Sequence, residues 1–138
     1  MPYNFPDIAR NANQTYGPTN RDHYYLPAPY HNPTAKKRAD KNRWCLKPPY
    51  QYEVFRVAEL HFEQYYGDGG LYGFLDNADE ILGKDNEERF AFFPNAINSP
   101  WHGYPIQSKE ISNDVVKRWH ESNLISTRTY RDILKREV

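Results

Sequence analysis

The stretch that organises this chain is residues 90–106, which read FAFFPNAINSPWHGYPI. Residues 90–93 have high strand propensity, and the proline that follows them ends regular strand pairing. Pro100 and Pro105 fix φ at both ends of the segment between them, which stiffens its backbone. Gly103 stands between bulky residues, which favours either a positive φ or a close approach of the backbone. We therefore expect a short strand followed by a rigid loop.

The loop displays three side chains that suit a functional site, namely Trp101, His102 and Tyr104. An indole, an imidazole and a phenol on a stiff loop can bind a partner or take part in catalysis. The same residues suit a structural role, because Trp and Tyr beside proline commonly close the end of a core. Both interpretations predict that the helices of the chain pack against this loop.

Composition indicates one small, aromatic-rich domain. The chain has 138 residues, of which 38% are hydrophobic and 16% aromatic, so its core must be rich in Tyr and Phe. The single cysteine, Cys45, excludes a disulfide within this chain and a cysteine-rich zinc site. No apolar run matches a signal peptide or a membrane span. We expect a cytoplasmic protein without a membrane partner, and we predict no metal and no cofactor.

The neutral net charge conceals a strong polarity along the chain. Residues 1–49 contain 8 Lys and Arg against 3 Asp and Glu, whereas residues 50–89 contain 3 against 10. Residues 90–138 contain 7 against 5. The basic first segment can therefore either close on the acidic middle or face a different partner.

Residues 1–49 are predicted to form an extended arm, and residues 50–138 a single α+β domain. The arm holds 8 of the 11 prolines, which break any helical or alternating pattern. It is also rich in aromatic residues, unlike typical disordered segments. We expect it to pack on the folded body or on a partner through residues that include Tyr24, Tyr25 and Tyr30.

A basic cluster within the arm is a second candidate surface. Its residues are Lys36, Lys37, Arg38, Lys41, Arg43 and the interleaved Trp44. Basic side chains around an aromatic ring can bind a nucleic-acid backbone while the ring stacks on a base. The near-neutral balance of the whole chain instead favours a pairing of this cluster with the acidic middle.

Two helices are predicted before the central stretch. In residues 50–66 the apolar positions follow one stripe, whereas Glu53 and Glu59 fall outside it. In residues 71–82 a similar spacing recurs, with Asp68 as a cap. The strand at 90–93 should pair either with the arm or with residues 104–107.

The C-terminal residues are predicted to form an αα-hairpin. Ser112 and Ser126 are placed to cap its two helices, and Trp119 lies on the buried face of the first. A DNA-reading helix-turn-helix has a similar outline. The hairpin also resembles the short C-terminal oligomerisation hairpins of bacterial proteins, which implies a homo-oligomer as a further alternative.

These patterns together predict an α+β fold, mainly helical, with a small strand element, the C-terminal αα-hairpin and an extended Pro- and Tyr-rich N-terminal arm. The leading functional hypothesis is a small soluble protein that binds another protein through a charge-polarised surface rich in Tyr and Trp. Such residues supply interface anchors at low entropic cost. The expected contact residues are Trp101, Tyr104, Tyr24, Tyr25, Tyr30, Arg118 and Arg128.

Two alternatives assign the chain to other classes of protein. The first is a metal-independent ribonuclease, such as a toxin, in which His102 and His120 form the acid–base pair and Tyr104 donates a hydrogen bond. Arg118 or Arg128 would then hold the phosphate. The second is nucleic-acid binding without catalysis through residues 36–47.

Overall fold

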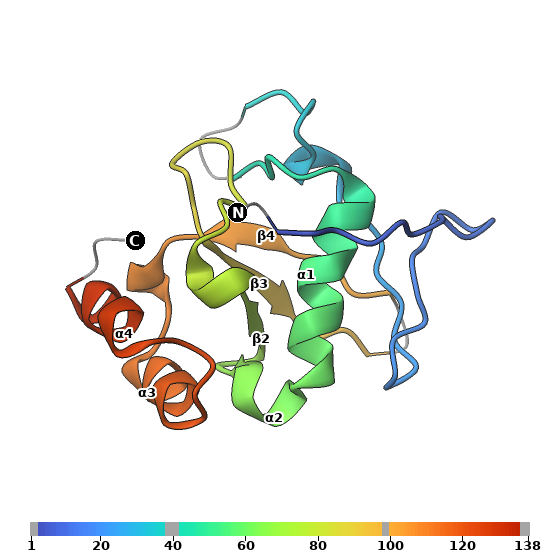
Figure 1. Ribbon diagram of the computed structural model, residues 1–138. Coiled ribbons are helices and arrows are strands. Elements are labelled where there is room, and N and C mark those ends of the chain that lie inside the picture. Colours follow the sequence, from blue (N-terminus) through green and yellow to red (C-terminus); the bar gives the residue numbers. More distant parts are fainter. Residues whose placement is uncertain (1–2, 38–41, 98–99, 136–138) are drawn as a thin grey trace.

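The computed structural model describes residues 3–37, 42–97 and 100–135. Within them, a four-stranded antiparallel sheet has the strand order β1-β2-β3-β4, and α1 crosses in front of it in Figure 1. The strands are β1 (Tyr66–Gly67), β2 (Gly70–Gly73), β3 (Phe90–Pro94) and β4 (Tyr104–Ile106). Helices and strands occur in one chain, so the predicted α+β class is confirmed.

The strand predicted at 90–93 is confirmed as β3, and it occupies the middle of the sheet. It pairs with β4, one of the two predicted partners, and with β2, which was not predicted to be a strand. Phe93 contacts Phe55 of α1, whereas Phe90 stacks on Trp119 of the C-terminal hairpin. Because side chains alternate along a strand, β3 supplies one aromatic anchor to each face of the sheet.

The close approach predicted at Gly103 is also confirmed. A Cβ at this position would lie 2.2 Å from Cδ1 of Phe93. That separation is too short for any side chain, so glycine allows the loop to pass directly over the Phe93 ring.

The first predicted helix has different bounds from those expected. α1 spans Pro48–Leu60 and begins with two prolines, which the first turn of a helix tolerates. It ends at His61, where φ is −113° and ψ is 43°, and a short α2 (Phe62–Tyr65) follows. The prediction of one helix over 50–66 is therefore wrong at both ends, because the chain must turn at residue 61 to enter the β1–β2 hairpin.

The prediction of a helix over 71–82 is wrong. These residues begin in β2 and continue through an irregular segment that includes the 3-10 turn η2 (Asp76–Ala78). All residues from 70 to 75 are buried. A strand buried on both faces has apolar residues at positions that also fit a helical spacing, and this ambiguity produced the error.

The predicted C-terminal hairpin is confirmed as α3 (Asn113–Glu121) and α4 (Thr127–Leu134), which pack together in the lower left of Figure 1. Ser126 caps α4 by accepting a hydrogen bond from the backbone N–H of Thr129. Ser112 occupies the N-cap position of α3, but its side chain makes no capping hydrogen bond. A 3-10 turn, η3 (Ser108–Glu110), links β4 to this hairpin.

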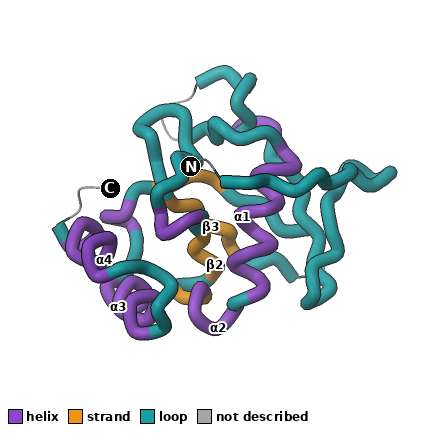
Figure 2. Tube along the Cα trace, viewed as in Figure 1, coloured by secondary structure: helices purple, strands orange, loops and turns teal. Residues whose placement is uncertain are grey.

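The N-terminal segment packs on the same core, and within residues 3–37 and 42–47 the structure describes no helix or strand other than the 3-10 turn η1 (Pro29–His31). Figure 2 shows its loops along the top and right of the molecule. Tyr16, Tyr25 and Trp44 of this segment are buried in one cluster with the residues of α1 and the sheet. The indole N–H of Trp44 donates to the backbone oxygen of Gly103 at 3.1 Å and so ties the arm to the loop before β4.

Carboxylates of the acidic middle hold the arm at three points. Glu53 accepts a hydrogen bond from the hydroxyl of Tyr3, and Glu59 accepts one from Thr19 at 2.5 Å. Asp85 pairs with Arg43 at 2.7 Å. Glu53 and Glu59 are each 1% exposed, so the expectation that they lie outside the buried surface of the helix is wrong. The arm covers the side of α1 that its sequence pattern leaves polar.

No helix in the described part of the chain is both long enough and apolar enough to cross a membrane.

Candidate functional site

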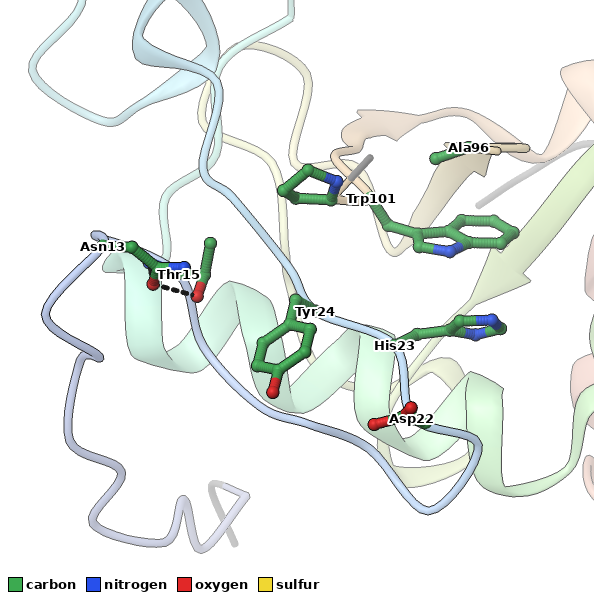
Figure 3. Close-up of a pocket in the computed structure, with 8 residues that line it drawn as sticks. Asn13, Thr15, Asp22, His23, Tyr24, Ala96 and Trp101 are labelled. Atoms are coloured by element: carbon green, nitrogen blue, oxygen red, sulfur yellow. Dashed lines mark hydrogen bonds between the residues drawn. The ribbon is translucent and has the colours of Figure 1, made fainter. Parts of the chain in front are cut away.

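A pocket of about 450 Å³ lies where the arm meets the loop before β4 (Figure 3). Two arm segments and the chain around Trp101 form its wall, with the residues Asn13, Thr15, Asp22, His23, Tyr24, Ala96, Pro100 and Trp101. Backbone hydrogen bonds fix the segments to each other. The N–H of Trp101 donates to the oxygen of Tyr24, and the N–H of Leu26 donates to the oxygen of Trp101, both at 2.8 Å. The pocket is therefore built on a braced backbone.

A tight turn holds two of the polar residues of this pocket. The N–H of Thr19 donates to the oxygen of His23 at 2.8 Å, and the N–H of Asp22 donates to the oxygen of Thr19 at 2.9 Å. Asp22 has a φ of 63°, a left-handed conformation that Asp and Asn adopt more readily than most residues. The turn thereby places Asp22 and His23 next to each other on the pocket wall.

His23 is oriented by a buried carboxylate. Its Nδ1 lies 2.9 Å from Oε1 of Glu59, which is 1% exposed, whereas the imidazole side chain is 36% exposed. Arg21 lies near the other carboxylate oxygen, with Nε at 3.9 Å. An ionised carboxylate only accepts hydrogen bonds, so beside it Nδ1 of His23 is the donor. The contact with Glu59 thus fixes the orientation of the imidazole.

The ring of His23 packs beneath the indole of Trp101, as Figure 3 shows. Their centroids are 5.5 Å apart, and the indole also contacts Phe55 of α1 at the same separation. Trp101 is 4% exposed. It therefore acts as a fixed part of the wall that joins the pocket to the core.

The three residues of the predicted display do not share one surface. Trp101 packs towards α1, whereas Tyr104 contacts Phe92 and stacks on His31 at 5.1 Å. His102 has a buried Nδ1 that finds no hydrogen-bond partner within the described residues. Of the three, Trp101 alone lines the pocket, and the common display expected from the sequence is wrong.

The proposed acid–base pair is not in contact in the structure. His120 stacks on Tyr130 with ring centroids 4.3 Å apart, and its Nε2 lies 3.2 Å from the Thr127 hydroxyl. These contacts hold it within the C-terminal hairpin, while His102 precedes β4. The ribonuclease hypothesis stays a prediction without geometric support in the described residues.

The two arginines assigned to phosphate or partner binding have different surroundings. Arg118 donates to the backbone oxygens of Glu63 and Tyr66, so it braces the chain after α1. Arg128 lines a separate polar pocket of about 370 Å³ beside Arg89 and Asp132. Neither arginine reaches the pocket around Trp101.

The three arm tyrosines also divide into exposed and buried residues. Tyr24 and Tyr30 are 38% and 37% exposed, whereas Tyr25 is fully buried and its hydroxyl donates to Gln51 at 2.9 Å. Burial raises the pKa of the Tyr25 phenol well above its ordinary value. Tyr25 thus supports the core, whereas the more exposed Tyr24 and Tyr30 remain candidates for binding a partner.

The basic cluster pairs with the acidic middle where the structure describes it. Arg43 forms hydrogen bonds to both carboxylate oxygens of Asp85, and Lys37 lies 3.6 Å from the same group. The hydrogen bonds from Arg43 lower the pKa of Asp85 to about 2. Trp44 is fully buried, so its ring has no free face on which a base could stack.

The remaining members of that cluster give little support for nucleic-acid binding. Lys36 lines a shallow pocket beside Tyr30. Arg38 and Lys41 lie outside the described residues. Because Arg43 is paired with Asp85 and Trp44 is buried, nucleic-acid binding through residues 36–47 stays a prediction that depends mainly on the lysines of this segment.

Sequence reasoning did not find Asp22, His23 or Glu59. His23 and Glu59 are 36 positions apart, so no local motif joins them. The one available signal was the run from Thr19 to Asp22, whose residue types favour a tight turn. Within the described residues, no group of three His, Cys, Asp or Glu side chains is placed to hold a metal ion.

Comparisons of the chain with protein-family models, with curated proteins and with solved structures give no match.

Proposed function

We propose that this chain is a small protein-binding protein of the cytoplasm, and that its partner contacts an apolar strip beside the pocket. The strip consists of Tyr24, Leu26, Tyr30 and Ile97, which are 38%, 39%, 37% and 84% exposed. Ile97 follows Ala96, which lines the same pocket as Tyr24. All four side chains are large. Tyr24 and Leu26 belong to a segment whose backbone is hydrogen-bonded to Trp101.

The observation that carries the proposal is the alternation along residues 24–27. Tyr25 and Pro27 are buried, whereas Tyr24 and Leu26 point outwards from the same extended segment. The backbone of this segment is bonded on one side to Tyr16 and on the other to Trp101. Apolar side chains on a rigid support lose little freedom on binding, which favours their use as anchors.

Charged side chains lie at the two ends of the strip, where they can add to the binding of a partner. Asp22 lies in the pocket beside Tyr24, and Lys36 lies beside Tyr30. Part of the charge polarity of the sequence is satisfied within the chain by the pair of Arg43 and Asp85. The proposed surface is therefore an apolar centre with a charged rim, as in many protein interfaces.

The test is site-specific crosslinking in the cells that produce the protein. A photoreactive p-benzoylphenylalanine replaces Leu26 in one variant and, in two controls, Leu60 or Leu134, which are 50% and 45% exposed elsewhere on the chain. We expect discrete covalent adducts from position 26 that disappear when Tyr24→Ser and Tyr30→Ser are added. Equal adducts from all three positions, or none from position 26, would refute the proposal.

A further inference from the structure

The exposed apolar side chains of the described residues are concentrated in the strip. Six large apolar residues are exposed, and four of them are Tyr24, Leu26, Tyr30 and Ile97. The other two lie singly, one on α1 and one on α4. Single apolar residues are normal on a protein surface, whereas a group of them indicates a contact surface.

The strip has an acidic end and a basic end. Asp22 lines the same pocket as Tyr24, and Lys36 lines the same shallow pocket as Tyr30. Figure 1 shows residues 20–37 running from the lower right of the view, past η1, to the top, so the two ends are well separated. Asp22 and Lys36 are both exposed, and neither has an ion-pair partner among the described residues. Both charges are therefore available to a partner.

A surface with this order of groups is complementary to itself. A two-fold axis through the apolar centre reverses the direction of the strip, so the acidic end of one copy faces the basic end of the other. Leu26 stands between Tyr24 and Tyr30 in the strip, which places it near such an axis. The chain has a formal net charge of zero, so two copies can approach without long-range repulsion.

The C-terminal hairpin offers less surface for self-association. Leu134 is the one large apolar residue of the hairpin that is exposed among the described residues. Trp119 of α3 and Ile133 of α4 are fully buried in the core of the chain itself. The apolar sides of both helices are thus already covered, and we expect self-association to depend on the strip.

We propose that the strip binds the strip of a second copy of this chain, in a two-fold dimer that places Asp22 of each copy opposite Lys36 of the other. The inference rests on the proposed function and names its partner. The apolar centre supplies the buried area, and the opposite charges set the direction in which the two copies meet. A different protein would need a surface with the reverse order of charges, whereas a second copy carries one by symmetry.

The test measures the mass of the purified full chain by sedimentation equilibrium, from about 1 μM to about 1 mM. Asp22→Lys and Lys36→Asp each turn both rim contacts into repulsions, so each should weaken the dimer about tenfold. The chain with both reversals regains both attractions and should dimerise like the parent. The two single variants, mixed in equal amounts, should pair with each other, because every rim contact then joins opposite charges.

Each charge reversal has a matched control on α3. Glu121→Lys and Lys117→Asp change the net charge equally at exposed positions and should leave the dimer unchanged. Asp22 has a left-handed φ of 63°, which Lys adopts less readily than Asp. This strain is the same in the single and the double variant, so it cancels when they are compared. Far-UV circular dichroism checks that each variant is folded.

A second pair of variants locates the interface. Leu26→Asp puts two like charges near the proposed axis and should weaken the dimer about tenfold or more. Leu134→Asp makes the same change at an exposed position of α4 and should have no effect. The opposite result would assign self-association to the hairpin and overturn the inference.

A chain that stays monomeric over the whole range would also overturn the inference. So would single reversals that weaken the dimer without rescue in the double variant and in the mixture, because two-fold pairing requires that rescue. The crosslinking test separates this result from the proposed function. Adducts that join position 26 to a different protein, with a chain that is monomeric in solution, would refute the inference and keep the protein-binding function. The loss of both the adducts and the dimer would refute both.

Discussion

The arm and the C-terminal hairpin pack against opposite faces of one sheet by different means. The arm supplies Trp44, which contacts Phe93, and the hairpin supplies Trp119, which stacks on Phe90. The hairpin consists of two helices that meet the sheet through an apolar side. The arm, in its described residues, has almost no regular structure and is held by carboxylates of the body in addition to its buried rings.

This difference shows that deep burial does not require regular secondary structure. Tyr25 and Trp44 of the arm have no exposed surface, and neither does Trp119 of the hairpin. An irregular chain must satisfy its backbone groups individually, which helices do automatically. The arm does so through long-range bonds, such as those of Tyr16 with Tyr25 and of Leu26 with Trp101.

The strongest test of the comparison removes one indole from each side of the sheet. We expect Trp44→Ala and Trp119→Ala each to lower the free energy of unfolding by about 3–5 kcal/mol, because both side chains are fully buried. Urea unfolding followed by far-UV circular dichroism measures the loss. If the arm only lay on the surface, Trp44→Ala would cost about 0.5 kcal/mol or less.

A finer test compares the two serines at the starts of the hairpin helices. Ser126→Ala should lower the free energy of unfolding by about 1 kcal/mol, because the Ser126 hydroxyl accepts from the N–H of Thr129. Ser112→Ala should cost only a few tenths, since that side chain makes no cap. The same urea titration serves for both variants. Equal losses would show that the capping bond does not stabilise the hairpin.

The last test concerns the polar contacts of the arm. The pKa of Asp85 is lowered from 3.8 to about 2 in the folded chain by the hydrogen bonds from Arg43. Its contribution is therefore complete above about pH 5 and is lost as the pH falls towards 2, because the unfolded chain binds the proton first. Asp85→Asn should flatten this part of the acid profile of the urea midpoint.

Asp132→Asn, which removes a carboxylate from α4, is the matched control for that profile. If both variants changed the acid profile equally, the loss would reflect net charge rather than the contact between Arg43 and Asp85. If neither changed it, the pairing of the arm with the acidic middle would make no measurable contribution to stability.

The sequence was informative where one local pattern had one structural solution. Residues 90–93 form the expected strand, and Ser126 caps the expected helix. The sequence pattern gave a wrong prediction where contacts between distant segments determined the secondary structure. Leu71, Phe74 and Leu75 fit a helical stripe, but they are buried in a strand and in the chain that follows it.

The candidate site was hidden for a related reason. Glu59 falls on the polar side of α1, and no local feature indicates that an arm segment from 40 positions earlier will cover it. Once covered, the carboxylate needs partners, and His23 with Thr19 provides them. The site thus arises from a contact between distant segments, whereas single-sequence patterns report only on near neighbours.

The hydrogen bond from Trp44 to Gly103 joins residues that are 59 positions apart, and it has a consequence for synthesis. A ribosome completes the arm long before it makes β3 and β4, so the docking surface for the arm does not yet exist when the arm emerges. During that interval the indole and its neighbouring rings stay exposed to solvent and to other nascent chains. The arm is therefore translated before β3 and β4 and is among the last segments described here to reach its native contacts.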